Sequence, residues 1–159
     1  MHIGLTGWQR ETAEGDFREL LALFRRADEL GFDSLWLPEY HLRRRGLLYP
    51  SPLLLAAAVF AVTERLRVGT GVTLLPVQHP LLLAEQLAQL DVQSGGRLDV
   101  GIGRGSDGAA LAALGAPPAE KHARFVAAYD LLVRAWGQDT VSSDDGPWTF
   151  AEVDRKSVV

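Results

Sequence analysis

Two stretches of this sequence decide its fold: LRVGTGVTLLP at residues 66–76 and LDVGIGRG at residues 98–105. Both are rich in aliphatic and β-branched residues and end on glycine, proline or polar residues, which is typical of buried strands in a parallel sheet. A helical pattern lies between them, so the sequence predicts a βαβ unit. Glycines let a backbone approach a ligand closely, and Arg104 is suited to hold an anion. We therefore expect a ligand site where these strands end.

The same strand-then-helix module recurs along the chain. Asp16 with Glu19 forms a capping box that predicts a helix start, and Gly31 marks the end of that helix. Strands are expected near residues 2–6, 32–37, 66–76 and 98–105, and helices near residues 16–31, 51–62 and 80–94 and after Pro118. Four such units in series require a parallel α/β sheet covered by helices, either an open doubly wound sheet or a barrel.

Apolar spacing indicates which faces of these elements are buried. The first helix carries an apolar stripe with helical spacing: Phe17, Leu20, Leu21, Phe24 and Ala27. The second is apolar on all sides over residues 53–62, so it should pack both on its own sheet and on a partner chain. The fourth carries Phe125, Tyr129, Leu132 and Trp136. In the second strand, Trp36 and Leu37 alternate and are expected in the core and at an interface.

The length of the chain is short for a barrel. A (β/α)8 barrel needs about 250 residues, whereas this chain has 159. Residues 1–153 are therefore expected to be the first four units of a single TIM-barrel domain. One reading of the codons for residues 154–159 spells sequencing-adapter sequence, so these residues are expected to be a non-native tail added where a longer gene was cut. An unbroken reading frame in the parent DNA would contradict this expectation.

Composition excludes several classes of function. A net charge of −4 and a pI near 5.5 argue against nucleic-acid binding, and no apolar run reaches the roughly 20 residues of a membrane span. The chain has no cysteine, which excludes disulfides and thiolate metal sites. No spacing of His, Asp and Glu indicates metal ligation, so no metal is expected. The default expectation is a cytoplasmic protein with small-molecule or protein partners.

Three motifs in register resemble the bacterial luciferase-like flavin-dependent monooxygenases. They are GFDSLWLPEYH at residues 31–41, VGTGV with PVQHP over residues 68–80, and SGGRL with GIGRG over residues 94–105. The resemblance covers residues 1 to about 150. It implies a TIM barrel that binds reduced FMN at the carboxyl ends of its strands and uses O2 to oxidise a small organic substrate, such as an aldehyde. It also implies a possible flavin reductase partner and a homodimer formed through helices 2 and 3.

The resemblance assigns cofactor contacts to the ends of strands three and four. Arg104, flanked by Gly103 and Gly105, is the expected ligand of the FMN phosphate, because a guanidinium offers a bidentate fork and the glycines leave backbone N–H groups exposed. Gly71 and Val72 match the place of a non-prolyl cis peptide under the flavin ring in family members, with Thr73 next to it. From the sequence alone, Gly71 is equally a β-bulge glycine.

Candidate catalytic residues follow strand two, where Glu39, Tyr40 and His41 lie at its expected carboxyl end. Luciferases proper carry two adjacent histidines here, and the first is the one tied to catalysis. In this chain Tyr40 takes that first position, which puts light emission in doubt, because a phenol does not exchange protons near neutral pH as an imidazole does. His41 is expected either to hydrogen-bond flavin or substrate or to hold its loop.

Alternatives to the monooxygenase remain open at this point. Gly103-Arg104-Gly105-Ser106-Asp107-Gly108 fits the G-x-G-x-x-G pattern of a Rossmann dinucleotide-binding domain, although it follows the fourth strand instead of the first. A non-catalytic flavin-binding protein or an inactive fragment is a second alternative. A deazaflavin could replace FMN, and only Arg104 favours FMN. The substrate cannot be assigned, since specificity lies in the loops after the strands.

Overall fold

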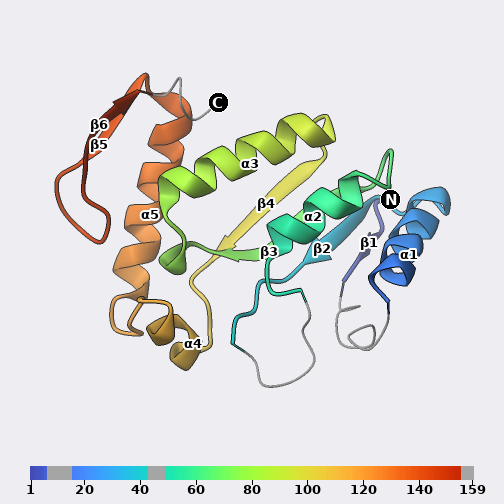
Figure 1. Cartoon of the computed structure of the whole chain (residues 1–159), viewed down its shortest axis with the longest axis horizontal. Coiled ribbons are helices and arrows are strands. Elements are labelled where there is room, and N and C mark those ends of the chain that lie inside the picture. Colours follow the sequence, from blue (N-terminus) through green and yellow to red (C-terminus); the bar gives the residue numbers. More distant parts are fainter. Residues whose placement is uncertain (7–15, 43–48, 155–159) are drawn as a thin grey trace. The chain divides into compact units, whose positions relative to one another are not determined.

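The computed structural model describes residues 1–6, 16–42 and 49–154 (Figure 1). Its residues form two compact units, each described here by itself. The first unit comprises Met1–Thr73 and Leu90–Gly101, and the second comprises Leu74–Gln89 and Ile102–Val159. None of the described helices is both long and apolar enough to cross a membrane.

Four strands form a single sheet in the order β1-β2-β3-β4, namely β1 (Gly4–Leu5), β2 (Ser34–Leu37), β3 (Arg67–Leu74) and β4 (Leu98–Gly103). The pairs β1–β2 and β2–β3 are parallel. Between β3 and β4, the Val68 amide donates to the Arg97 carbonyl, and Thr70 Oγ1 donates to the Gly101 carbonyl. The partners therefore advance in the same direction along both strands. The predicted parallel α/β sheet is confirmed.

The strand order also tests the doubly wound topology, one of the two that the sequence left open. A doubly wound Rossmann sheet reverses its order at a switch point, so that its first strand lies inside the sheet. Here the strands follow one another in chain order, and β1 lies at the edge of the sheet. The Rossmann alternative is therefore wrong for this sheet.

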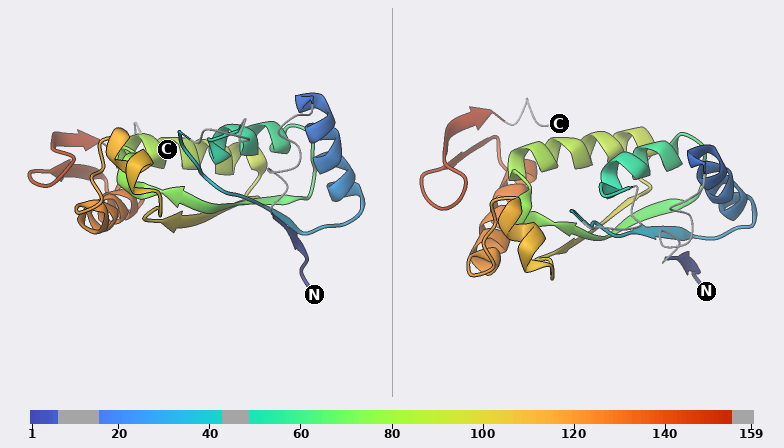
Figure 2. Two further views of the ribbon diagram at one scale, coloured as in Figure 1. Left: turned by 90° about the horizontal axis from the view of Figure 1, so that it is seen from below. Right: turned by 60° about the horizontal axis from the view of Figure 1, so that its bottom comes forward.

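The core of the first unit lies between the sheet and two helices on one of its faces, α1 (Phe17–Glu29) and α2 (Pro52–Phe60) (Figure 2). Leu35 and Leu37 of β2 are fully buried on this side. The other buried members of the cluster are Leu20, Phe24, Leu55, Ala56, Val59, Phe60, Leu66, Val68 and Leu90. Because successive strand residues point to opposite faces, Trp36 lies on the face of the sheet away from these helices.

Both ends of α1 follow the sequence signals. The Asp16 side chain caps the amino end by accepting a hydrogen bond from the Arg18 amide, and Gly31 adopts a φ of 83° just beyond the carboxyl end. Leu20, Phe24 and Ala27 are buried as expected. Phe17 is more exposed than predicted, because it lies in the first turn and only the Tyr49 ring stacks on it, at 5.4 Å between centroids.

The second unit departs further from expectation. It contains the 3₁₀ turn η2 (Leu75–Val77), most of α3 (Pro80–Ser94), α4 (Gly108–Ala113) and α5 (Lys121–Gly137). The short helix α4 was not predicted. The buried face of α5 consists of Ala128, Leu131, Leu132 and Ala135. The expected aromatic stripe is therefore partly wrong, since Tyr129 is 50% exposed and Trp136, whose Nε1 donates to the Ala84 carbonyl, is 37% exposed.

A hairpin of β5 (Thr140–Ser143) and β6 (Phe150–Asp154) follows α5. The strand β6 pairs antiparallel with β5 in a separate two-stranded sheet. Asp154 ends β6 opposite Thr140. The remainder of the expected tail, residues 155–159, lies outside the described residues.

Candidate functional site

The predicted site residues lie at the carboxyl ends of their strands. Tyr40 and His41 follow β2, residues 71–73 fall at the end of β3, and Arg104 follows β4. In a barrel this end of the strands carries the active site. The first two groups belong to the first unit and Arg104 to the second. The geometry of each group is described within its own unit.

After β2, the imidazole of His41 pairs with the carboxylate of Glu39. His41 Nε2 lies 2.6 Å from Glu39 Oε1, and the Glu39 side chain is 1% exposed whereas that of His41 is 23% exposed. Residues i and i+2 of an extended segment point to the same side, which brings the two side chains together. The sequence analysis placed Glu39 at this strand end but gave it no role. The i, i+2 spacing of Glu39 and His41 in the sequence could have indicated this pair.

Tyr40 lies half-buried between the two paired residues in the chain. A phenol can both donate and accept a hydrogen bond. The position that resembles the first histidine of luciferases thus holds a phenol that can form hydrogen bonds, and His41 follows it.

At the end of β3, the peptide bond between Gly71 and Val72 is cis, as expected from the resemblance. The contact of this peptide with a flavin stays a prediction. Thr73 is fully buried, and its Oγ1 has no hydrogen-bond partner within the described part of the chain. Buried hydroxyls are almost always hydrogen-bonded. Thr73 therefore fits a bound group that brings a polar atom to this strand end.

The glycines of β3 and β4 also have a structural role. A Cβ on Gly69 would lie 2.5 Å from the Trp36 ring, and one on Gly101 would lie 2.2 Å from the Thr70 carbonyl oxygen. The indole of Trp36 lies across the neighbouring strands, and its Nε1 donates to Ser34 Oγ at 3.2 Å. These glycines allow close packing on the face of the sheet away from α1 and α2, which the sequence analysis attributed to ligand approach alone.

Arg104 is exposed after β4, and its guanidinium makes no hydrogen bond or ion pair with any residue that the structure describes. The following residue, Gly105, has a φ of 78°, and a Cβ there would lie 3.1 Å from the Leu111 side chain. Only glycine fits this turn without strain. All five donors of Arg104 are thus available for an anion, as the phosphate assignment requires.

The start of α4 argues against the dinucleotide alternative a second time. In a Rossmann site, the amides at the helix amino end bind the pyrophosphate. Here the Asp107 carboxylate accepts hydrogen bonds from the amides of Ala109 and Ala110, at 3.2 and 3.1 Å. A carboxylate already occupies these amides and would repel a second anion.

The run SGGRL at residues 94–98, which was part of the motifs that resemble the family, has a structural explanation. Arg97 donates to the carbonyl oxygens of Ser94, Leu66 and Phe60 at 2.7, 3.2 and 3.3 Å, and to Thr63 Oγ1 at 3.1 Å. Its guanidinium also lies 5.0 Å from the centre of the Phe60 ring. Arg97 therefore holds the carboxyl ends of α2 and α3, where helix dipoles favour a cation.

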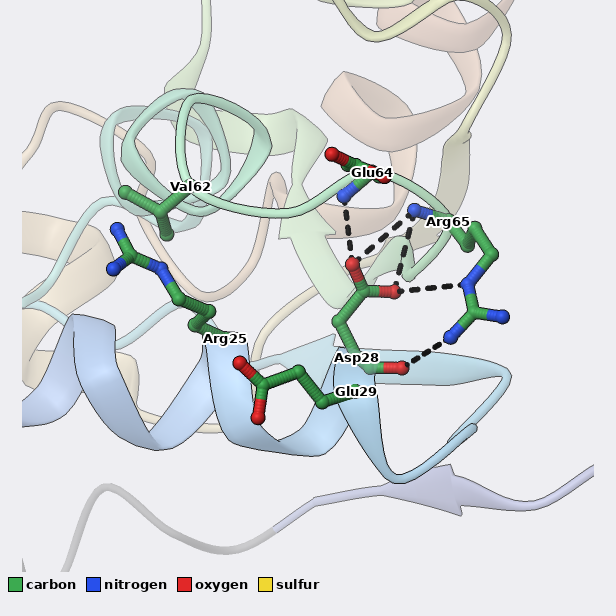
Figure 3. Close-up of a pocket in the computed structure, with 6 residues that line it drawn as sticks. All are labelled: Arg25, Asp28, Glu29, Val62, Glu64 and Arg65. Carbon is green, nitrogen blue, oxygen red and sulfur yellow. Dashed lines mark hydrogen bonds and ion pairs between the residues drawn. The ribbon is translucent and has the colours of Figure 1, made fainter.

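A cavity of about 420 Å³ lies near the carboxyl end of α1 (Figure 3). It is lined by Arg25, Asp28, Glu29, Val62, Glu64 and Arg65. The Asp28 carboxylate accepts hydrogen bonds from the amides of Glu64 and Leu66 at 2.7 and 2.8 Å, and the Arg65 guanidinium donates to the Asp28 carbonyl at 2.7 Å.

Hydrogen bonds to the Asp28 carboxylate outweigh the effect of burial on its pKa. Burial alone would raise its pKa, but the amides of Glu64, Arg65 and Leu66, with the charge of Arg65, hold the pKa of this carboxyl below its usual value. The cavity lies where β3 begins, and conservation or polar contacts at that end of a barrel serve stability. Because Asp28 is satisfied by the protein itself, this cavity is a structural feature.

The remaining histidines do not converge on a site. His2 pairs with Asp33 on the surface at 3.3 Å, His79 lies 6.2 Å from the Phe150 ring, and His122 is exposed. Across residues 1–6, 16–42 and 49–154, no group of three or more His, Cys, Asp or Glu side chains is arranged to hold a metal ion.

Sequence comparison finds monooxygenases among the proteins similar to this chain. It is 33% identical over 140 residues to limonene 1,2-monooxygenase of Rhodococcus erythropolis, a match covering 87% of this chain and 36% of the relative. It is 35% identical over 97 residues to the oxygenase component of flavin-dependent trigonelline monooxygenase of Acinetobacter baylyi, covering 61% of this chain and 27% of the relative.

Solved structures agree with the fold. Monooxygenase RslO1 of Streptomyces bottropensis superimposes with a TM-score of 0.81 at 36% identity, covering 94% of this chain and 46% of that one. The oxygenating constituent of 3,6-diketocamphane monooxygenase of Pseudomonas putida, solved with FMN, superimposes with a TM-score of 0.81 at 23% identity. The match covers 94% of this chain and 44% of that one. An F420-dependent secondary alcohol dehydrogenase superimposes with a TM-score of 0.74 at 21% identity, and the match covers 97% of this chain and 47% of that one. The last two likenesses show the fold alone.

The chain spans less than half the length of each of these proteins. The model of the luciferase-like monooxygenase family nevertheless matches residues 3–156, almost the whole chain. The parallel sheet, the cis peptide and the three sequence motifs agree with this match. The chain therefore belongs to the luciferase-like monooxygenase family.

Proposed function

We propose that this chain is the first half of a (β/α)8-barrel monooxygenase that uses reduced FMN and O2 to oxidise a small organic substrate of the aldehyde type. The observation that carries the proposal is the guanidinium of Arg104, which has no partner in the described part of the chain and lies between glycines after β4. Support for the barrel comes from the sequential strand order and from RslO1, whose chain this one covers by 46%.

The residues that would hold FMN come from two strand ends. Arg104 would bind the phosphate through its bidentate fork, with the amides near Gly103 and Gly105 close by. The Gly71–Val72 peptide and Thr73 would contact the isoalloxazine ring, and Thr73 Oγ1 has the unsatisfied hydrogen-bonding capacity for it. When bound, reduced FMN supplies the electrons that activate O2. The protein's part is to position substrate and cofactor and to exclude water.

His41 and Tyr40 would act at the end of β2. The imidazole of His41 can donate or accept a hydrogen bond, and Tyr40 can donate one. The absence of a histidine at position 40 makes light emission an unexpected property of this protein. Oxidation of the substrate without luminescence is the expected outcome.

The choice between FMN and a deazaflavin as the cofactor rests on the proposed phosphate contact of Arg104. An F420-dependent dehydrogenase shares the fold, so a deazaflavin is the competing cofactor. FMN ends in a phosphate monoester, which suits a guanidinium that is free to bind from two sides. The titration below includes both cofactors.

The test is a flavin titration of this chain and of a version extended with the second half of a relative. FMN and a deazaflavin are added, oxidised and reduced, and fluorescence and absorbance are followed. Saturable FMN binding that Arg104→Ala weakens at least tenfold supports the proposal. The matched control is Arg18→Ala, an exposed arginine of α1, which should leave binding unchanged. Tighter binding of the deazaflavin, insensitive to Arg104, would refute the FMN assignment.

The same titration separates the alternatives. A non-catalytic flavin-binding protein would bind FMN without oxidising any aldehyde when reduced FMN and O2 are supplied. An inactive fragment would bind only in the extended version. Sequencing the parent DNA across codons 153–159 tests the proposal that residues 154–159 are a non-native tail.

Partners and location follow from the proposed chemistry. An enzyme that consumes reduced flavin needs a source of it, and the trigonelline relative is named as an oxygenase component. We expect a separate flavin reductase and a cytoplasmic location, where reduced flavin is available. Neither nucleic acid nor a membrane is an expected partner.

A further inference from the structure

The pair of Glu39 and His41 has no role in the cofactor contacts proposed above. The Glu39 carboxylate is almost completely buried, and its Oε1 lies 2.6 Å from His41 Nε2. A carboxylate buried to this degree is normally held by strong hydrogen bonds. The short contact to an imidazole at a strand's carboxyl end therefore calls for an explanation beyond packing.

The chemistry of the two groups sets the direction of the hydrogen bond. An ionised carboxylate only accepts hydrogen bonds, so His41 Nε2 must carry the proton and donate it. In a neutral imidazole one nitrogen donates and the other accepts. With the proton on Nε2, the lone pair lies on Nδ1. No described residue hydrogen-bonds to Nδ1, and the imidazole is partly exposed.

We propose that Glu39 is a positioning residue, which fixes His41 in the tautomer with its proton on Nε2 and so presents Nδ1 as a hydrogen-bond acceptor at the site. This inference rests on the proposed function, because it assumes that flavin or substrate approaches the end of β2. It resembles the way in which a carboxylate orients the histidine of a catalytic triad by accepting from one ring nitrogen. Glu39 itself need not touch the ligand.

The inference names an acceptor and therefore a ligand chemistry. A group approaching Nδ1 must bring a donor, such as the N–H of a reduced flavin or the hydroxyl of a hydrated carbonyl. The neighbouring Tyr40 offers an O–H donor. Tyr40 and His41 would thus present opposite hydrogen-bonding capacities at adjacent positions.

Histidine ¹⁵N NMR of the full chain tests the tautomer directly. His41→Gln assigns the resonances, and spectra are recorded at about pH 8.5, well above the ordinary histidine pKa. In the wild type, His41 should show one fully protonated nitrogen, Nε2, one fully unprotonated nitrogen, Nδ1, and a downfield, slowly exchanging Nε2 proton. Exposed His122 is the internal reference and should show averaged shifts of two exchanging tautomers.

The variant Glu39→Gln keeps the size of the side chain, but an amide donates as readily as it accepts and no longer forces the proton onto Nε2. His41 in this variant should move toward the averaged shifts of His122 and lose the downfield proton. The matched control, Glu85→Gln, changes an exposed glutamate on α3 and should leave His41 unchanged. If Glu39→Gln fails to fold, the comparison of His41 with His122 in the wild type still tests whether His41 is held in one tautomer.

Two results would overturn the proposal. One is a wild-type His41 with averaged shifts or a protonated Nδ1, and the other is a tautomer unaffected by Glu39→Gln. Addition of reduced FMN then separates this inference from the proposed function. If reduced FMN binds through Arg104 but moves neither nitrogen of His41, flavin as the donor to Nδ1 is refuted and the flavin site stands. If FMN does not bind, the proposed function fails while the tautomer result still decides the role of Glu39.

Discussion

At Gly101 the backbones of β3 and β4 lie too close together for a side chain. A Cβ added there would lie 2.2 Å from the Thr70 carbonyl oxygen, and backbone atoms cannot move aside as a flexible side chain can. Gly101→Ala should therefore destabilise the protein by about 2–4 kcal/mol, as overpacking and strained backbone do. Chemical denaturation followed by circular dichroism measures the effect.

The matched control for Gly101 is Gly137, at the end of α5. No atom lies within 4 Å of a Cβ built on it, and its φ is not in the left-handed region. Gly137→Ala should leave stability unchanged or raise it by up to about 1 kcal/mol, because alanine is the better helix former. Equal stability losses in the two variants would contradict the close approach at Gly101.

Asp28 should make stability depend on pH. Its pKa is lowered in the folded state: burial works against this, and the amides of Glu64, Arg65 and Leu66 outweigh it. A group with a depressed folded pKa contributes stability above its unfolded value, near 3.8, and that stability is lost as the pH falls through the folded value. Asp28→Asn should cost about 1–3 kcal/mol at pH 7, and the difference from wild type should shrink below pH 4.

Urea unfolding of both proteins between pH 2.5 and 7 measures this dependence. Asp130→Asn is the control, since Asp130 forms an exposed i, i+4 pair with Arg134 and should change stability by less than about 0.5 kcal/mol. A difference between wild type and Asp28→Asn that stayed constant across this pH range would rule out the ionised, hydrogen-bonded carboxylate.

Single residues show where sequence reasoning succeeds and where it stops. The cis peptide at Gly71–Val72 was expected because a family motif marks it. The pairing of Glu39 with His41 was missed, since it depends on the extended backbone after β2 placing both side chains on one side. The structural role of Gly101 was not predicted, because its neighbour, the Thr70 carbonyl, lies 31 residues away in the chain and no local pattern names it.

At the scale of elements, Arg97 connects the ends of two helices to the start of β3. It donates to the Phe60 and Ser94 carbonyls, the unsatisfied acceptors that every helix has at its carboxyl end. Arg97→Lys keeps the charge but cannot reach separated acceptors with one ammonium group. We expect a loss of about 1–3 kcal/mol and faster amide hydrogen exchange over residues 61–66.

A control for this prediction is Arg18→Lys, at an exposed position on α1. It should alter neither stability nor hydrogen exchange. If Arg97→Lys accelerated exchange uniformly through the chain and not locally, the role of Arg97 as a link between helix ends would be wrong.

Element boundaries were predictable wherever a cap or a breaker marks them. Asp16, Gly31 and the Ser51–Pro52 pair set the limits of α1 and the start of α2, and each is observed in that role. The buried face of α5 was not predictable in the same way. Large aromatic residues suggested one stripe, but the alanines Ala128 and Ala135 line the buried face, where small side chains allow closer packing.

At the scale of the whole molecule, the parallel α/β class followed from alternating strand and helix patterns, and the motif at residues 103–108 suggested a topology that the sheet does not have. Strand order depends on contacts between residues that lie far apart in the chain, and a six-residue glycine motif does not specify it. The β5–β6 hairpin was likewise only partly predictable from the sequence. Its strand propensity is visible from Phe150 onward, whereas its partner β5 has a polar sequence.

The predicted homodimer concerns α2 and α3, whose exposed apolar residues include Leu54 and Val92, each 77% exposed. An apolar helix face left in water favours association. Leu54→Glu should place a charge on that face without disturbing the core, because the side chain already lies outside it, and should convert a dimer to a monomer in sedimentation velocity. Leu23→Glu on α1, at a half-exposed leucine, is the matched control and should leave the oligomeric state unchanged. A wild-type chain that sediments as a monomer, or a Leu54→Glu variant that remains dimeric, would remove α2 from the interface.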